Sequence, residues 1–461
     1  MLSPPINCTF QENNKTPKDK ISISSNEDLN ELPKKQRNSM SSSSGAGDAT
    51  SLKSWHSLSS EESSHITELR ERLGAKLLEA TPLYNDDHSL LRWIHGWDAK
   101  FSEIVPRYQK ASQIFEALGL NELDFETPDD VNDFVGNMYP ASEYFVGGLM
   151  GYDNHGNAIV VQSVGQIAPK HLVHCGRVSD VFYLSIVEAV LTMKLIKRQE
   201  KKYNRRLGII VMLDLDGLCV DHIMPQTVKV YMNLLKLLQD LFPDVAQKIC
   251  IINAPSLFAS AYNLVKPAIA MKSRQKIRVL SHTYKEQLCE ELGAENIYPH
   301  WGGTKVAVRG REDTGTLRMG GIPPESLRYI PLNNPHHIDD LKLTKINVPA
   351  RSTRCIEVEC AQDGHTLNWF FHSSSDVEFS VFYKNEKEEE HLVVPQFRVH
   401  TSYVPEYNSV KCRKAGTYIL CFDNTFSTFF SKDVRYHAHC VDPNCSEEEE
   451  TGIDCVEALG A

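Results

Sequence analysis

The sequence predicts a multidomain protein in which an α/β domain is followed by an all-β sandwich. Apolar strands alternate with long amphipathic helices from about residue 140, as in a mixed or partly parallel sheet covered by helices. Near residue 340 the helical pattern stops, and short strands of alternating hydrophobicity recur with turns between them, which is typical of an antiparallel sandwich. A connector rich in Gly and Pro, "RGREDTGTLRMGGIPPESLRYIPLNNP", separates the two patterns.

The chain of 461 residues is too long for one core, since domains average roughly 150 residues. We expect residues 1–60, rich in Ser and Asn, to be a disordered tail, because they hold too little apolar surface to offset the entropy of ordering. A helical region over residues 61–125 follows, in which Ile66, Leu69 and Leu73 recur at helical spacing behind a Ser/Glu capping box. We expect an acidic tail over residues 443–461.

The α/β domain is expected over residues 126–305. Its strand candidates include "LGIIVML" and "KICIINA", which are continuous apolar runs. Such runs predict strands that are buried on both faces. The linker is expected over residues 306–338 and the sandwich over residues 339–442, with strands such as "TLNWFFH" and "GTYILCFDNT".

Composition excludes several classes of protein. The formal net charge of −11 argues against nucleic acid as a partner, because phosphate binding needs a basic surface. The chain has neither a signal-peptide pattern nor a run of 18 apolar residues, so we expect a cytoplasmic protein. Its 12 cysteines are scattered, several in apolar strands, such as Cys250 and Cys421. We therefore expect reduced core thiols rather than a disulfide framework.

Catalytic motifs are absent: there is no G-x-S-x-G, P-loop, G-x-G-x-x-G, H-E-x-x-H or C-x-x-C. Asp214 and Asp216 end an apolar strand, where they are either an acid or metal ligand or caps of the turn at Gly217, and we favour the caps. A linker group is better explained by solvated side chains than by a metal site; it contains His336, His337, Asp339 and Asp340. We expect no catalytic residue, no metal site, no cofactor and no enzyme activity.

Residues 251–270, "IINAPSLFASAYNLVKPAIA", carry much apolar surface and no recognisable chemistry. They start as a strand, turn at Asn-Ala-Pro and continue as an apolar stretch. Two interpretations remain open, namely ordinary core and a lid over a cavity.

Residues 88–304 resemble the CRAL-TRIO lipid-binding family of the yeast phosphatidylinositol transfer protein. The resemblance rests on the order of "LLRWIHGW", "LDLDGL", "FPDVAQKICIINAPSLFASAYNLVKPAI" and "YPHWGGT". The sandwich, with "SYVPE" and "AGTYILCFDNTFSTFFSK", resembles a GOLD domain. The combination is similar to the supernatant-protein-factor (tocopherol-associated) group of lipid transfer proteins.

This resemblance implies an intracellular protein that holds one lipid in an apolar pocket under a gate helix and exchanges it at membranes. The alternative is a lipid-sensing adaptor in membrane trafficking or signalling, with a protein partner bound through the GOLD domain. The candidate ligand-binding residues are Trp97, Ile209, Val211, Leu213, Asp244, Phe258, Tyr262, Val265, Ile269 and Lys276.

The headgroup positions depart from the phosphatidylinositol pattern of the family. Where that pattern has two hydroxyls and an Arg, this chain has Ile209, Val211 and Trp97, while Asp244 and Lys276 retain the acid and the Lys. A phosphate buried against apolar residues is poorly paired. We therefore expect an isoprenoid, a tocopherol-like molecule or a phospholipid held mainly by its tails. Asp244 and Lys276 are expected either to pair at the pocket mouth or to be separate solvated charges.

Two basic stretches interrupt an acidic protein. One runs from residue 194 to 206, and the other contains Lys272, Arg274, Lys276 and Arg278. They are either solvated faces or sites of transient contact with an anionic membrane.

Overall fold

The structure, a computed structural model, describes residues 58–442. The expected N-terminal tail, up to residue 57, and the acidic tail over residues 443–461 lie outside the described residues. Among the helices of the described range, none combines the length and the apolar character that a bilayer crossing requires.

Four helices precede the first strand, as the helical pattern predicts. They are α1 (Ser60–Glu79), α2 (Asp87–Gly96), α3 (Phe101–Ala117) and α4 (Pro128–Gly136). The expected capping box starts α1, where the Glu62 amide donates to the Ser59 hydroxyl and the Ser59 amide to the Glu62 carboxylate. Arg92 of α2 is 1% exposed. It forms an ion pair with Glu200 and donates to the Leu207 carbonyl at 2.7 Å, which fastens these helices to the α/β domain.

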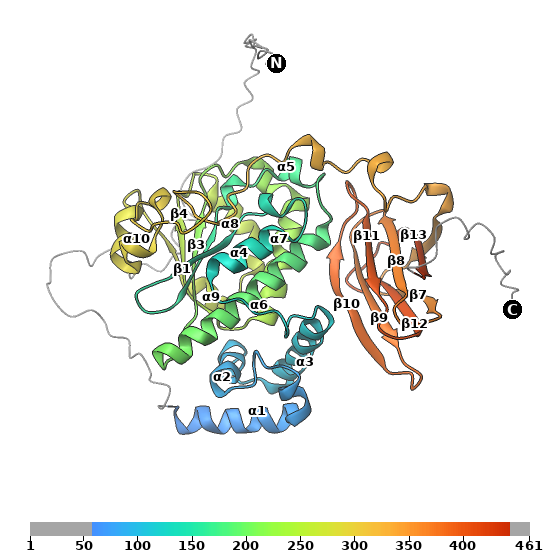
Figure 1. Ribbon diagram of the computed structural model, residues 1–461, viewed down its shortest axis with the longest axis horizontal. Helices are drawn as coiled ribbons and strands as arrows, with labels where there is room; N and C mark the ends of the chain where they lie inside the picture. Colours follow the sequence, from blue (N-terminus) through green and yellow to red (C-terminus); the bar gives the residue numbers. More distant parts are fainter. Residues whose placement is uncertain (1–57, 443–461) are drawn as a thin grey trace, which may run out of the picture. The chain divides into compact units, whose positions relative to one another are not determined.

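The α/β domain is built on a five-stranded sheet of order β1-β2-β3-β4-β5. β1 is antiparallel to β2, and the other neighbours are parallel. The strands are β1 (Gly148–Tyr152), β2 (Ala158–Gln162), β3 (Ile209–Asp214), β4 (Ala246–Ile252) and β5 (Ile277–Val279). The helices are α5 (Pro169–Leu172), α6 (Val178–Tyr203), α7 (Pro225–Leu241), α8 (Phe258–Val265), α9 (Met271–Gln275) and α10 (Tyr284–Leu292) (Figure 1). The predicted mixed sheet with helices is confirmed.

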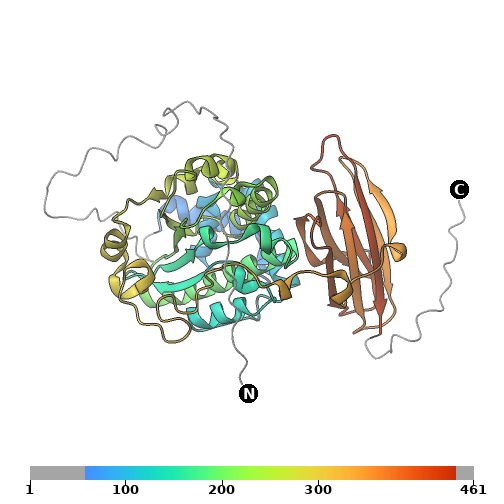
Figure 2. The same ribbon diagram turned by 90° about the horizontal axis from the view of Figure 1, so that it is seen from above.

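The C-terminal domain is all-β, as expected, with two four-stranded antiparallel sheets of order β10-β9-β12-β7 and β11-β8-β13-β6 (Figure 2). Its strands are β6 (Thr344–Val348), β7 (Thr353–Cys360), β8 (Thr366–Ser373), β9 (Val377–Lys384), β10 (Glu390–Val399), β11 (Glu406–Lys411), β12 (Gly416–Asp423) and β13 (Lys432–Val441). Phe371, Phe379 and Phe422 pack against one another between the sheets, with ring centroids 4.8 to 5.2 Å apart.

One cysteine expectation is wrong. Cys421 is joined to Cys355 in a disulfide, with their Cα atoms 4.2 Å apart. The register of β7 against β12 sets these two residues directly opposite each other, a proximity that a linear sequence does not display. Cys250 is a buried free thiol, as expected.

A buried carboxyl lies where α6 meets the sandwich. The Ser179 hydroxyl donates to Glu406 Oε1 at 2.5 Å. Burial raises the pKa of Glu406 to about 7, opposed by the Arg177 guanidinium nearby. Phe182 and Phe397 stack beside this group, with centroids 5.1 Å apart. The junction therefore holds an acid that takes up a proton near neutral pH.

Glu406→Gln tests that junction. Because the folded pKa lies above the ordinary 4.5, the group's contribution to stability is fully present below pH 4.5 and is lost as pH rises to about 7. The loss amounts to as much as ~3 kcal/mol. Above pH 7 we expect Glu406→Gln to melt at a higher temperature than the native chain, with a flatter profile between these pH values. Glu357→Gln, at an exposed position of β7, is the control. Parallel profiles for the native chain and Glu406→Gln would contradict the assignment.

Candidate functional site

One face of the five-stranded sheet is closely packed and the other is not. Ile210 and Met212 of β3 are 4% and 0% exposed and belong to a core shared with α10. The alternating residues Ile209, Val211 and Leu213 face the other way and are only half-buried. β3 lies between β2 and β4, so an edge position does not explain this accessible surface. The prediction that both faces of the strand are buried is wrong for this face.

The helix α7 also carries apolar residues that are only half-buried. It lies beside α6 and α8 (Figure 1), yet Leu241 is its one buried residue. Tyr231 keeps accessible surface, although burial raises the pKa of its hydroxyl. Further apolar residues of α7 are half-buried, namely Val228, Val230, Met232, Leu235 and Leu238, whereas Leu234 and Leu237 pack against the core.

The segment between β4 and β5, residues 253–276, is called the α8–α9 segment here. No residue of α8 is buried. Phe258 and Tyr262 lie with ring centroids 5.8 Å apart, and both are half-buried, like Val265 and Ile269. None of these four residues belongs to either hydrophobic core of the described chain. The half-burial of these four residues favours the lid interpretation for this part of the stretch, whereas Ile251, Ile252 and Ala268 are buried.

A buried carboxylate anchors the start of this segment. Asp214, at the end of β3, is 4% exposed. It accepts hydrogen bonds from Trp301 Nε1 at 2.9 Å, from Asn253 Nδ2 at 2.9 Å and from the Asp216 amide at 3.1 Å. Three of the sequence motifs thus meet at one side chain, and both of its oxygens are engaged. This favours the turn-cap role expected for Asp214.

The other end of the segment carries a charged cluster. Lys276 Nζ lies 2.9 Å from Asp244 Oδ1 and donates to the Ala246 carbonyl at 2.6 Å. Asp244 Oδ2 is also 3.6 Å from the Arg206 guanidinium and 3.8 Å from His95 Nδ1. Burial, together with Arg206, lowers the pKa of His95. The expected contact between Asp244 and Lys276 is present, at the amino-terminal edge of the parallel strands.

Other candidates lie elsewhere. Trp97 follows α2, and its ring packs under the Arg107 guanidinium at 3.9 Å, among the N-terminal helices. The four polar linker residues do not gather into one site: His337 contacts the Tyr329 hydroxyl at 3.0 Å, and Asp340 lies 3.1 Å from His372. A separate hollow of about 750 Å³ lies beside α4. It includes none of the predicted site residues.

The sequence interpretation missed the half-buried residues of α7, and His95 and Arg206 of the charged cluster. The sequence of α7 could have indicated a second apolar face. In "VKVYMNLLKLLQDL" the apolar residues cover more of the helix than one packed stripe requires. No local pattern indicates that His95 and Arg206 meet Asp244.

Part of the chain is similar in sequence to a known domain. Residues 142–303 match the sequence model of the CRAL/TRIO domain. These residues are a CRAL/TRIO domain. The match contains all of β1 to β5 and the α8–α9 segment. The helices α1 to α4 precede it.

The sandwich matches a different model. Residues 330–449 match one described as "F28H7_8_C:-like, C-terminal domain". That description does not name GOLD, so the identity of the sandwich as a GOLD domain stays a prediction.

Two relatives of known sequence match most of the chain, and a third matches about half of it. Protein ctg-1 of Caenorhabditis elegans is 22% identical over 366 residues, covering 77% of this chain and 92% of the relative. The CRAL-TRIO domain-containing protein C34C12.6 of the same organism is 23% identical over 409 residues, covering 85% and 98%. The Sec14 cytosolic factor of Schizosaccharomyces pombe is 25% identical over 223 residues, covering 47% and 74%. The crystal structure of Sfh5 aligns with 59% of this chain and 92% of its own, at 14% identity and a TM-score of 0.39.

Asp214→Asn tests the anchor of the CRAL/TRIO domain. Asn keeps one acceptor oxygen, so the Trp301 or the Asn253 donor loses a charged partner, at a cost of about 2–3 kcal/mol. We expect a lower midpoint of chemical denaturation. Asp216→Asn, at an exposed position, is the matched control and should change stability by less than ~0.5 kcal/mol. Equal stability of the two variants would argue against the anchor.

Proposed function

We propose that the chain is a cytoplasmic lipid-binding and transfer protein that holds one hydrophobic molecule between its sheet and α8 and releases it at membranes. CRAL/TRIO proteins typically bind and transfer lipids. The observation that carries the proposal is the layer of half-buried apolar residues on the inner face of β3, on α7 and on α8.

The layer suits an apolar occupant. Val211 and Leu213 offer one apolar wall, and Phe258 and Tyr262 offer another. Each methylene that such walls remove from water gains ~0.8 kcal/mol. An acyl or isoprenoid chain therefore binds without any directed polar contact, and no catalytic residue is required.

The polar end of the site favours a weakly charged occupant. Lys276 already neutralises Asp244 and donates to a backbone carbonyl, so it is not a free cation for a phosphate. Ile209 and Val211 stand where the phosphatidylinositol pattern has hydroxyls. Both features support an isoprenoid, a tocopherol-like molecule or a phospholipid held by its tails.

Loading the full chain with a lipid extract and identifying the bound species by mass spectrometry tests the proposal. We expect apolar lipids in the native chain and a loss of at least tenfold in Val211→Trp, because the indole fills the space beside β3. Phe258→Ala should retain less lipid while melting near the native temperature. Val308→Trp is the control, since Val308 is 88% exposed in the linker. Recovery of phosphatidylinositol alone would overturn the choice of ligand, and no bound lipid at all would overturn the function.

The α8–α9 segment is the proposed gate. Its basic residues are engaged in this structure: Lys272 lies 2.5 Å from Asp98, and Arg274 donates to the carbonyls of Ile269 and Lys266 at 2.8 and 2.7 Å. Lys276 is paired with Asp244. Movement of the segment would break the pairs of Lys272 and Lys276, whose partners lie outside it, and would free two cations near exposed apolar residues such as Met271, which is 65% exposed. An anionic membrane would replace the lost partners, so docking and opening become one event.

Reversing the charges tests this latch. Lys276→Glu and Asp244→Lys should each speed lipid transfer about fivefold, because the pair is worth ~1 kcal/mol. The double reversal should recover part of the native rate, since Arg206 also lies 3.6 Å from Asp244 and opposes a cation there. Native transfer should be faster to anionic than to neutral vesicles and should slow as salt rises. The exposed pair Lys345 and Asp433, 3.1 Å apart in the sandwich, provides matched control reversals. A rate that ignores vesicle charge, salt and both reversals would rule out the latch.

A second function has one observation in its favour. Phe429 and Phe430, between β12 and β13, are 83% and 75% exposed, and exposed aromatic pairs are typical of contact surfaces. They support a lipid-sensing adaptor that binds a protein partner through the sandwich. Partner binding that survives Val211→Trp while cellular function is lost would place the essential activity in the pocket instead.

A further inference from the structure

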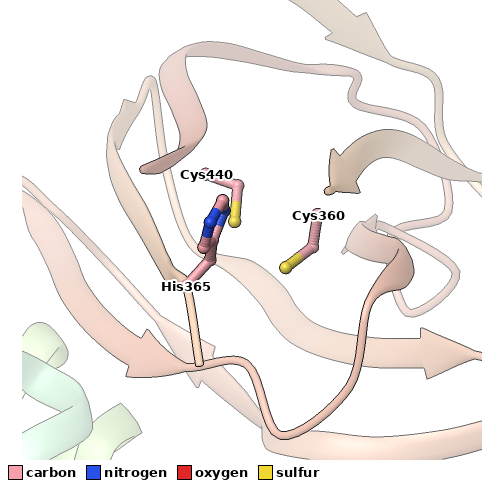
Figure 3. A group of neighbouring side chains, drawn as sticks. All are labelled: Cys360, His365 and Cys440. Atoms are coloured by element: carbon pink, nitrogen blue, oxygen red, sulfur yellow. The ribbon is translucent and has the colours of Figure 1, made fainter. Parts of the chain in front are cut away.

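The sandwich contains a group of Cys and His side chains that lies outside the CRAL/TRIO domain. Cys360 ends β7, His365 lies in the turn that leads into β8, and Cys440 lies near the end of β13. One ligand atom from each side chain lies within 4.8 Å of those of the other two. Figure 3 shows the three side chains facing a common space at one end of the sandwich.

A fourth ligand lies beside them. Cys412, just after β11, is 0% exposed, and its Sγ is 3.9 Å from that of Cys440. Zinc bonds of about 2.3 Å to sulfur that meet at the tetrahedral angle separate two sulfurs by roughly 3.8 Å. The spacing of Cys412 and Cys440 is therefore the spacing of two zinc ligands.

The backbone holds the loops of this group in place. The Cys412 amide donates to the His365 carbonyl at 2.7 Å, and the Gly364 amide donates to the Cys412 carbonyl at 2.8 Å. Gly364 has a φ of +86°, a conformation that L side chains rarely adopt, so the turn that presents His365 depends on this glycine. Two ligand-bearing loops are thus joined before any metal arrives.

Basic residues adjoin the group in the sequence. Lys411, Arg413 and Lys414 lie on either side of Cys412 and are exposed. The nearby carboxylate of Asp363 accepts the Ala415 amide at 2.7 Å. Cys360, His365 and Cys440 offer two sulfurs and one imidazole nitrogen within 4.8 Å of one another, and Cys412 offers a third sulfur beside Cys440. Three thiolates and one imidazole are the donor types of a closed structural zinc site.

We propose that Cys360, His365, Cys412 and Cys440 bind one structural Zn²⁺. Cys360 belongs to the sheet β10-β9-β12-β7, and Cys440 to the sheet β11-β8-β13-β6. The ion joins the two sheets at one end of the sandwich. The disulfide between Cys355 and Cys421 joins two strands of a single sheet and does not do this. No catalytic step is involved, since all four positions are filled by protein.

Metal analysis of the full chain, purified under reducing conditions, tests the site. We expect about one zinc ion per chain in the native protein and in Cys289→Ser, which removes a free cysteine of α10. Cys440→Ser and His365→Ala should lose most of the metal, and His365→Cys, which keeps four ligands, should retain it. Replacement with Co²⁺ should give the visible absorption of a tetrahedral thiolate complex and a lower melting temperature on chelation.

Three outcomes would overturn the proposal. The first is a native chain that holds no stoichiometric metal and gives no such Co²⁺ spectrum under reducing conditions. The second is metal retained equally by Cys440→Ser and His365→Ala. The third is a disulfide between Cys412 and Cys440, identified by mass mapping after alkylation, in place of metal. Because His365 is half-buried, His365→Ala keeps the test valid if Cys440→Ser fails to fold.

Discussion

The carboxylate of Asp214 is the constraint on which the α/β domain depends. A buried carboxylate is tolerated only where its lone pairs are satisfied, and this one is satisfied by the indole of Trp301, the amide of Asn253 and the backbone of Asp216. This one side chain therefore holds together the end of β3, the residue that follows β4 and the segment that contains Trp301. The α8–α9 segment leaves the sheet from this fixed point.

Buried ion pairs hold α6 against the N-terminal helices and the connector. Arg92 and Glu200 join the N-terminal helices to α6, and Arg318 of the connector lies 2.7 Å from Glu188 of the same helix. Removing one partner of such a pair leaves an uncompensated buried charge, which costs several kcal/mol. α6 is thus tied on both sides, whereas α7 and α8 make few fully buried contacts. The layer that faces the half-buried side of β3 is therefore less closely packed than α6, and under the proposed function it is the layer that moves.

The order of strands and helices and the change to an all-β domain follow from periodicity, which is a local property. The half-buried face of β3 does not, because an apolar strand has the same sequence whether a side chain or a ligand covers it. The contact between Asp244 and Lys276 follows from the resemblance, whereas nothing in the sequence indicates that the Arg107 guanidinium lies over the ring of Trp97. The sequence does not predict contacts between distant strands. The disulfide at Cys355 and the cluster at Cys360 both depend on strand register.

The α8–α9 segment is held at both ends by anchors of unequal strength. Asn253 is bound to a carboxylate that is 4% exposed, whereas the side chains of Lys276 and Asp244 are 26% and 14% exposed and open to screening by salt. Between these ends, Gln239 of α7 binds the backbone of Ala268 and Ala270. Under the proposed function, the segment opens first at the more exposed pair, and a long molecule beneath it leaves with the end nearest the start of β5 emerging first. The buried carboxylate of Asp214, at the carboxyl end of β3, then determines which end of the lipid leaves the protein first.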